Sequence, residues 1–99
     1  MTGQGECFKF AYQYVKDNGG ILFHAIVTHP WDKKKYWHAW VEKNGQIIDW
    51  QGYIGHDLSS RVKKEWYKLW KPTRIRAYTK SQAFMSMVKN THYGPWGAK

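Results

Sequence analysis

The sequence predicts one small α+β domain in which an N-terminal helix packs on a largely antiparallel sheet. Three observations lead to this fold class. The chain has 99 residues, which is the usual size of a single domain. Apolar residues recur with the period of a helix in some segments and form extended runs in others. An Asn-Gly pair between two extended segments is typical of a β-hairpin. We expect one domain over residues 1–99, with elements in the order α-β-β-β-α-β-α.

The first expected element is a helix over residues 6–18. Four apolar residues recur at the spacing of one helical face: Phe8, Ala11, Tyr12 and Val15. Asn18-Gly19-Gly20 ends this helix, because glycine readily adopts the left-handed conformation that closes one. The apolar run over residues 21–29 then predicts a buried strand, which Pro30 ends.

Two further strands are expected over residues 36–42 and 46–50. They flank Asn44-Gly45, and a two-residue type I′ turn needs positive φ at both of its positions. Such a turn pairs Trp40 with Asp49 across the hairpin. The sequence therefore predicts a specific register as well as a hairpin.

The second half of the chain predicts a helix, a strand and a last helix. The first of these helices starts within residues 57–60 and ends before Pro72. Its expected inward face consists of Leu58, Val62, Trp66, Leu69 and Trp70. A strand over residues 73–79 and a helix over residues 81–90 follow. The expected inward residues of that last helix are Phe84, Met85 and Val88.

The amino-acid composition excludes several classes of protein. The chain has 16 Lys and Arg against 7 Asp and Glu, a formal charge of +9, and 18% aromatic residues. Disordered basic tails contain few aromatic residues, so this chain is not one of them. No apolar run approaches the roughly 20 residues of a membrane span, and the first residues do not form a signal peptide. A single cysteine makes no internal disulfide, so we expect a soluble cytoplasmic protein without membrane contact.

Three residues form a candidate catalytic group. Cys7 is expected at the start of the first helix, where the helix dipole stabilises a thiolate. His38 lies two residues from Trp40 and therefore shares a sheet face with Asp49. His38 can then serve as the base and Asp49 as the group that orients it. A three-residue turn would place Asp49 on the opposite face.

Gln4 and two tryptophans complete the expected site. The Gln4 amide and the Cys7 backbone N–H are candidate donors to a developing oxyanion. Trp40 and Trp50 flank His38 and Asp49 and are candidate walls of a substrate cleft. The structural alternatives stay open: a buried cysteine, a loop glutamine and tryptophans of the sheet core.

Three short segments resemble the papain-like cysteine peptidase and transglutaminase-like superfamily: Gly5-Glu6-Cys7-Phe8, His38-Ala39-Trp40-Val41-Glu42 and Gly45-Gln46-Ile47-Ile48-Asp49-Trp50. The resemblance implies a minimal papain-like core with Cys7 as nucleophile, His38 as base and Asp49 as orienting group. It implies a hydrolase or acyl transferase of the peptidase or amidase type that works through a thioester. Peptides, isopeptides or amides would be its substrates, with no cofactor.

Binding without catalysis is the alternative function. Seven basic residues lie between residues 61 and 76, with Trp66, Tyr67 and Trp70 among them: Arg61, Lys63, Lys64, Lys68, Lys71, Arg74 and Arg76. This pattern suits nucleic acid, but Trp66 and Trp70 lie on the apolar helix face, so nucleic-acid binding is not favoured, and a non-specific affinity at low salt is a better match than specific recognition. An inhibitor or interaction protein is the other possibility, and the positive charge favours an acidic protein partner.

No metal site is expected. His24 and His29 are an odd number of positions apart, so on one strand they point to opposite faces. The chain has no paired Cys or His spacing of the kind that zinc sites use.

Overall fold

The computed structural model describes residues 3–30, 32–49 and 63–96, with the backbone alone for residues 3–6 and 63–65. These residues form a four-stranded antiparallel sheet and three helices, which confirms the α+β class. Their elements, in chain order, are α1 (Gly3–Asn18), β1 (Ile21–Thr28), β2 (Lys35–Lys43), β3 (Gln46–Ile48), α3 (Lys63–Trp70), β4 (Thr73–Tyr78) and α4 (Lys80–Asn90). No described helix is long and apolar enough to cross a membrane.

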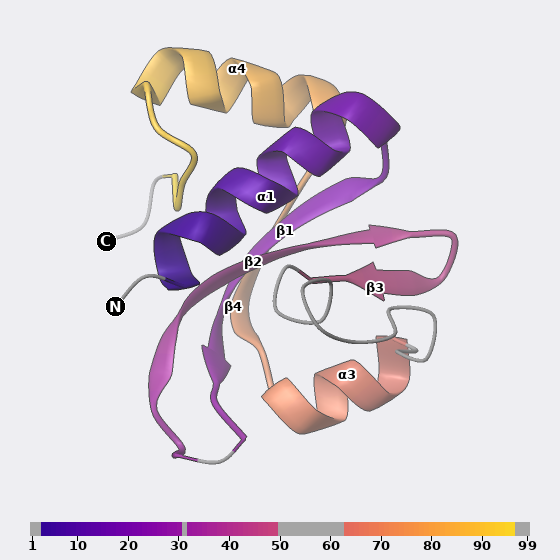
Figure 1. Ribbon diagram of the computed structural model, residues 1–99, viewed down its shortest axis with the longest axis vertical. Coiled ribbons are helices and arrows are strands. Elements are labelled where there is room, and N and C mark those ends of the chain that lie inside the picture. Colours follow the sequence, from indigo (N-terminus) through magenta and orange to yellow (C-terminus); the bar gives the residue numbers. More distant parts are fainter. Residues whose placement is uncertain (1–2, 31, 50–62, 97–99) are drawn as a thin grey trace.

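The sheet has the strand order β3-β2-β1-β4 and separates two apolar cores (Figure 1). Side chains alternate between the two faces along each strand. On β2, Ala39 and Val41 belong to the core under α1 and α4, whereas Trp40 belongs to the core under α3. The described elements are therefore stacked in three layers, with the sheet in the middle.

The predicted face of the first helix is confirmed, since Phe8, Ala11, Tyr12 and Val15 are all buried. The helix begins at Gly3, however, three residues earlier than expected. Cys7 is thus the fifth residue of α1 rather than a residue of its first turn. Only the first four N–H groups of a helix lack an intrahelical acceptor. The backbone N–H of Cys7 therefore lies beyond those unpaired groups, which corrects the expectation that it is one of them.

The hairpin forms as predicted. Asn44 and Gly45 have φ values of 54° and 77°, as a type I′ turn requires. Lys43 pairs with Gln46 across the turn, and the register continues through Val41 and Ile48. Asp49 follows directly and falls on the face of the sheet that α3 covers.

The inward face of α3 is predicted only in part. Trp66 and Trp70 are buried as expected, whereas Leu69 is exposed and its predicted burial is wrong. The two tryptophans are four positions apart and fill the core, so the neighbouring position turns toward solvent. Leu58, Val62 and the expected start of this helix lie outside the described residues.

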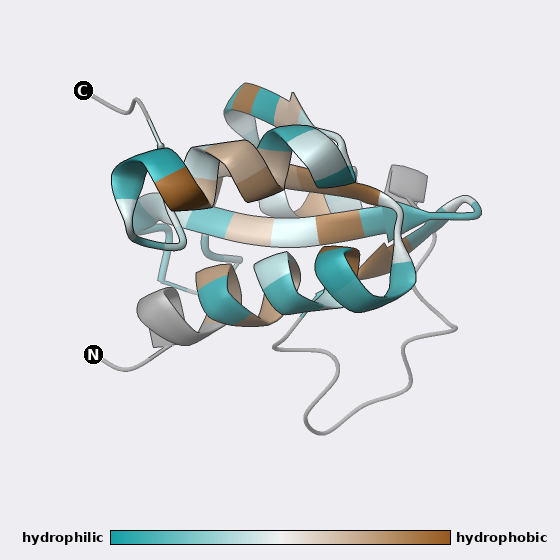
Figure 2. Cartoon of the chain, turned by 90° about the horizontal axis from the view of Figure 1, so that it is seen from above, coloured by the Kyte–Doolittle hydropathy of each residue, from teal (hydrophilic) through white to brown (hydrophobic). Residues whose placement is uncertain are grey.

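The predicted inward face of α4 is wrong. Phe84, Met85 and Val88 are 51%, 64% and 53% exposed. The helix instead packs through Ala83, which is buried, and Met87, which is partly buried one turn later. Each residue along a helix turns by about 100°, so the large apolar residues next to Ala83 and Met87 face outward. Hydrophobic bands on α4 are visible from above in Figure 2.

Candidate active site

His38 and Asp49 form the polar centre of the molecule. The Nε2 atom of His38 lies 3.1 Å from Oδ1 and 3.2 Å from Oδ2 of Asp49. The indole N–H of Trp66 donates to the same carboxylate over 3.2 Å. Both His38 and Asp49 are buried. The shared face that the hairpin register predicts for these two residues is therefore present.

The carboxylate changes the charge state of the imidazole. Burial by itself lowers the pKa of His38, but the charge and hydrogen bond of Asp49 outweigh it. Cys7 acts in the same direction, and together they raise the pKa of His38 to about 10. At neutral pH His38 is thus a buried imidazolium held by an anionic partner.

Cys7 approaches the same ring from α1. It is close enough to contribute to the raised pKa of His38, after the larger effect of Asp49. Because Asp49 takes Nε2, the ring nitrogen that remains is Nδ1, which is buried and has no hydrogen-bond partner among the described residues. The structure therefore brings Cys7, His38 and Asp49 to one place in the fold.

Cys7 and the His38 ring belong to opposite faces of the sheet. Cys7 belongs to the core on the α1 face, whereas the His38 ring lies on the α3 face. β3 pairs only with residues 41–43 of β2, so among the described strands the preceding part of β2 has no neighbour on that side. α1 packs along β2 (Figure 1).

Three tryptophans surround the His38 ring. The ring centroid of Trp70 is 5.9 Å away at an interplanar angle of 10°, and those of Trp66 and Trp40 are both 6.4 Å away. Trp40 is fully buried and belongs to the core under α3, which was the structural alternative, and its role as a cleft wall stays a prediction. Its indole N–H donates to Glu42 over 3.1 Å. The tryptophans exclude water from the imidazolium, which strengthens its attraction to the carboxylate.

The remaining expected site residues lie outside what the structure describes. Gln4 is within α1, but its side chain is not among the described ones. Trp50 follows the last described residue of the hairpin. The oxyanion role of Gln4 and the cleft role of Trp50 stay predictions.

Sequence reasoning missed the polar role of Trp66. We assigned this residue to the core from its helical spacing, and it is buried there, yet it also donates to Asp49. A buried indole N–H usually finds an acceptor, which was the available signal. Trp66 therefore helps to fix the carboxylate that holds His38.

His24 is a second buried histidine that the sequence did not single out. It packs among Phe8, Tyr78 and Trp96, at ring-centroid distances of 4.8, 5.1 and 4.9 Å. Within the described part of the chain, neither of its ring nitrogens has a hydrogen-bond partner. Burial, together with the charges of Arg76 and His38, lowers the pKa of His24 to about 3. His24 is thus a neutral histidine within an aromatic box.

Among the described residues no group of three or more His, Cys, Asp and Glu side chains is arranged to hold a metal ion. Comparison of the chain with protein-family models, with curated proteins and with solved structures gave no match. The functional proposal therefore rests on the site's own geometry.

Proposed function

We propose that the protein is a cysteine-dependent hydrolase or acyl transferase of the papain-like type. Cys7 is the nucleophile, His38 the general base and acid, and Asp49 the orienting group. One observation carries the proposal: a single buried imidazole is held by a carboxylate at Nε2 and is acted on by a thiol. Peptide, isopeptide and amide carbonyls are the substrates that this chemistry attacks.

The first half of the reaction makes a thioester. The Cys7 sulfur attacks the carbonyl carbon, a C–S bond forms, and the carbonyl oxygen becomes an oxyanion. The intermediate then collapses and its C–N bond breaks. The imidazolium of His38 gives its proton to the departing amine, which leaves as a neutral molecule.

The second half releases the acyl group. Water attacks the thioester while His38 accepts its proton, and the C–S bond breaks to give the acid and the Cys7 thiolate. Because His38 now carries that proton, it is again an imidazolium. If an amine attacks in place of water, the acyl group is transferred instead of hydrolysed.

Asp49 supports both halves by fixing the imidazole. Its carboxylate accepts a hydrogen bond from the Nε2–H group, so Nδ1 is the nitrogen that exchanges protons with the sulfur and the substrate. It also stabilises the positive charge that the ring carries before each release step. Trp66 holds the carboxylate through its indole N–H and is a positioning residue.

Burial of the thiol favours a second candidate function, binding without catalysis. Cys7 is only 1% exposed, so a carbonyl can reach its sulfur only after the residues that cover it have moved. In a pure binding protein those residues stay in place, and His38 and Asp49 serve as a buried structural pair. Reactivity of Cys7 in the folded protein separates the two functions.

An activated ester provides that test without knowledge of the natural substrate. The folded protein is mixed with p-nitrophenyl acetate, and release of p-nitrophenol is followed alongside the intact mass. The proposal predicts a burst of one p-nitrophenol per chain and one acetyl group on Cys7, the single cysteine. Cys7→Ser abolishes the burst, and His38→Gln slows it by about 10²-fold or more.

The folding state of each variant is checked by circular dichroism and thermal unfolding, because His38 is buried. Asp49→Asn, which keeps the shape of the side chain, is expected to slow acetylation in a folded protein. Acetylation of Cys7 only under denaturing conditions would refute the catalytic proposal and support the binding function.

A further inference from the structure

The outer surface of α4 carries apolar side chains that the domain itself does not cover. Phe84, Met85 and Val88 are more than half exposed. Scattered single apolar residues on a surface are ordinary, but these three lie within five positions of one helix. Neighbouring exposed apolar residues of this kind mark interaction sites on soluble proteins.

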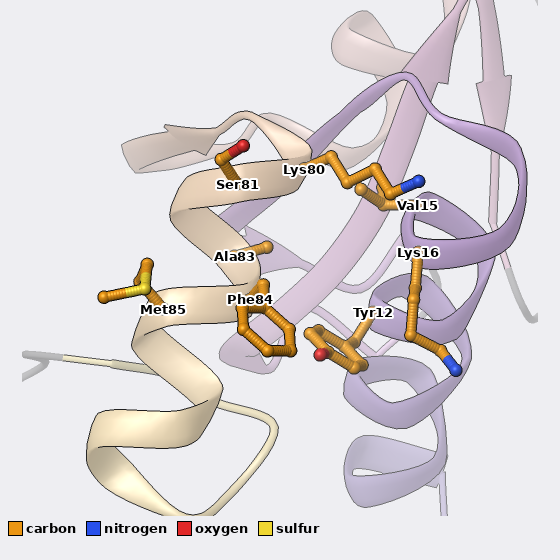
Figure 3. Close-up of a pocket in the computed structure, with 8 residues that line it drawn as sticks. All are labelled: Tyr12, Val15, Lys16, Lys80, Ser81, Ala83, Phe84 and Met85. Carbon is orange, nitrogen blue, oxygen red and sulfur yellow. The ribbon is translucent and has the colours of Figure 1, made fainter.

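A cavity lies beside these residues, between α4 and α1. Its volume is about 330 Å³. Figure 3 shows Tyr12 of α1 and Phe84 of α4 directed toward each other, with Val15 and Ala83 nearby. The hollow has room for apolar side chains of a partner and an apolar lining against which they can pack.

The cavity has a positively charged border. Lys16 of α1 and Lys80 of α4 line it, and Figure 3 shows Lys80 extending toward α1. α4 contains no acidic residue and carries Lys89 in its last turn. Asp17 lies 3.8 Å from Lys16, but both side chains are solvent-exposed, so this ion pair is weak. The site therefore combines an apolar centre with basic edges.

We propose that this surface binds an acidic amphipathic helix of a partner protein. Apolar side chains of that helix enter the cavity and pack on Phe84, while its carboxylates pair with Lys16 and Lys80. The site is separate from the candidate catalytic group, because neither Cys7, His38 nor Asp49 lines the cavity. The proposal is thus independent of the proposed function.

The positive charge of the protein favours an acidic helix over a second copy of the chain at this surface. Each copy carries a formal charge of +9, and two α4 surfaces bordered by lysines would repel one another. Shape selects it over a lipid surface, because a concave hollow between two helices fits side chains that project from a helix.

A pair of matched synthetic peptides tests the proposal. One peptide is a fluorescein-labelled amphipathic helix with leucines along one face and glutamates elsewhere, and the other has lysines in place of the glutamates. Fluorescence anisotropy measures binding to the intact chain, and amide NMR shifts locate it. The acidic peptide is expected to bind saturably and to shift Tyr12, Ala83 and Phe84, whereas the basic peptide is not.

Three variants separate the apolar contribution from the charged one. Phe84→Ala is expected to weaken acidic-peptide binding by about tenfold or more, and its exposed position keeps the fold intact. The double variant Lys16→Glu and Lys80→Glu is expected to abolish the preference for the acidic peptide. The double variant Lys34→Glu and Lys68→Glu, an equal charge change at two exposed positions that do not line the cavity, is the control and is expected to retain that preference.

Several results would overturn the proposal. If both peptides bind equally well, or if Phe84→Ala does not change binding, the assignment of this surface is wrong. Concentration-dependent dimers in sedimentation that Phe84→Ala disrupts make a second copy the occupant. Phe84-dependent binding to phosphatidylserine vesicles, with no binding of the acidic peptide, makes a membrane the occupant.

Discussion

His38 and Asp49, eleven positions apart in the chain, are hydrogen-bonded at the centre of the domain, where Nε2 lies 3.1 Å from Oδ1. The relationship follows from one turn. Asn44 and Gly45 set a hairpin register that places the two side chains on the same face of the sheet. α3 then closes over that face and adds the Trp66 donor to the carboxylate.

Removal of the carboxylate should destabilise the fold strongly. Asp49→Ala leaves a buried imidazolium and a buried indole N–H without their acceptor, and we expect it to lower the free energy of unfolding by about 3–5 kcal/mol. Urea denaturation measures the change. Asp32→Ala is the matched control, since it removes a surface His–Asp pair with His29 and should cost less than about 1 kcal/mol. Equal losses in the two variants would contradict the assigned role of the buried pair.

His38 should make the protein sensitive to alkali. Its pKa rises from an ordinary value of 6.5 to about 10 on folding. A raised pKa gives stability that is fully present below pH 6.5 and is lost as the pH rises through about 10. The melting temperature should therefore fall across this interval in the wild type and fall less in His38→Gln. Identical pH profiles for the two proteins would contradict the shift.

His24 should have the opposite effect in acid. Its pKa falls from 6.5 to about 3 on folding, so its contribution to stability is present above pH 6.5 and is lost as the pH falls toward 3. NMR titration of the folded protein should show a neutral His24 ring throughout this interval. Ring shifts that titrate near pH 6.5 would contradict its placement in the aromatic box.

Gly94 should tolerate alanine poorly. Its φ is 124°, and an added Cβ would collide with Cε1 of His24. Gly19→Ala is the control, because Gly19 also has a positive φ, of 84°, but open space around it. Left-handed backbone alone costs alanine about 1–2 kcal/mol, and Gly94→Ala should lower the free energy of unfolding by more than Gly19→Ala does. Equal costs would show that the collision is absent.

The sequence predicts correctly the features that depend on residues close together in the chain. The Asn44-Gly45 turn permits one backbone geometry, and that geometry brings His38 and Asp49 to one face. The buried face of α1 was equally predictable, because Phe8 and Val15 belong to one apolar stripe. Both features depend on residues close together in the chain.

Features that depend on distant segments were not predictable. Burial of Trp40 depends on α3 covering that face of the sheet, and the rotation of α4 depends on Ala83 fitting against another part of the fold. The box around His24 is completed by Trp96, which lies near the other end of the chain. Helical spacing alone treated Phe84 as a core residue, because periodicity does not show which side of a helix meets its neighbour.

The central claim is that Cys7 and His38 act as a unit in the folded protein. The most direct test is the rate of Cys7 alkylation by iodoacetamide at neutral pH, under native conditions, in the wild type and in folded His38→Gln. Cys7→Ser serves as the blank. We predict that the folded wild type is alkylated and that His38→Gln slows the reaction by about tenfold or more. Alkylation only at the rate of global unfolding, equal in both proteins, would contradict the claim.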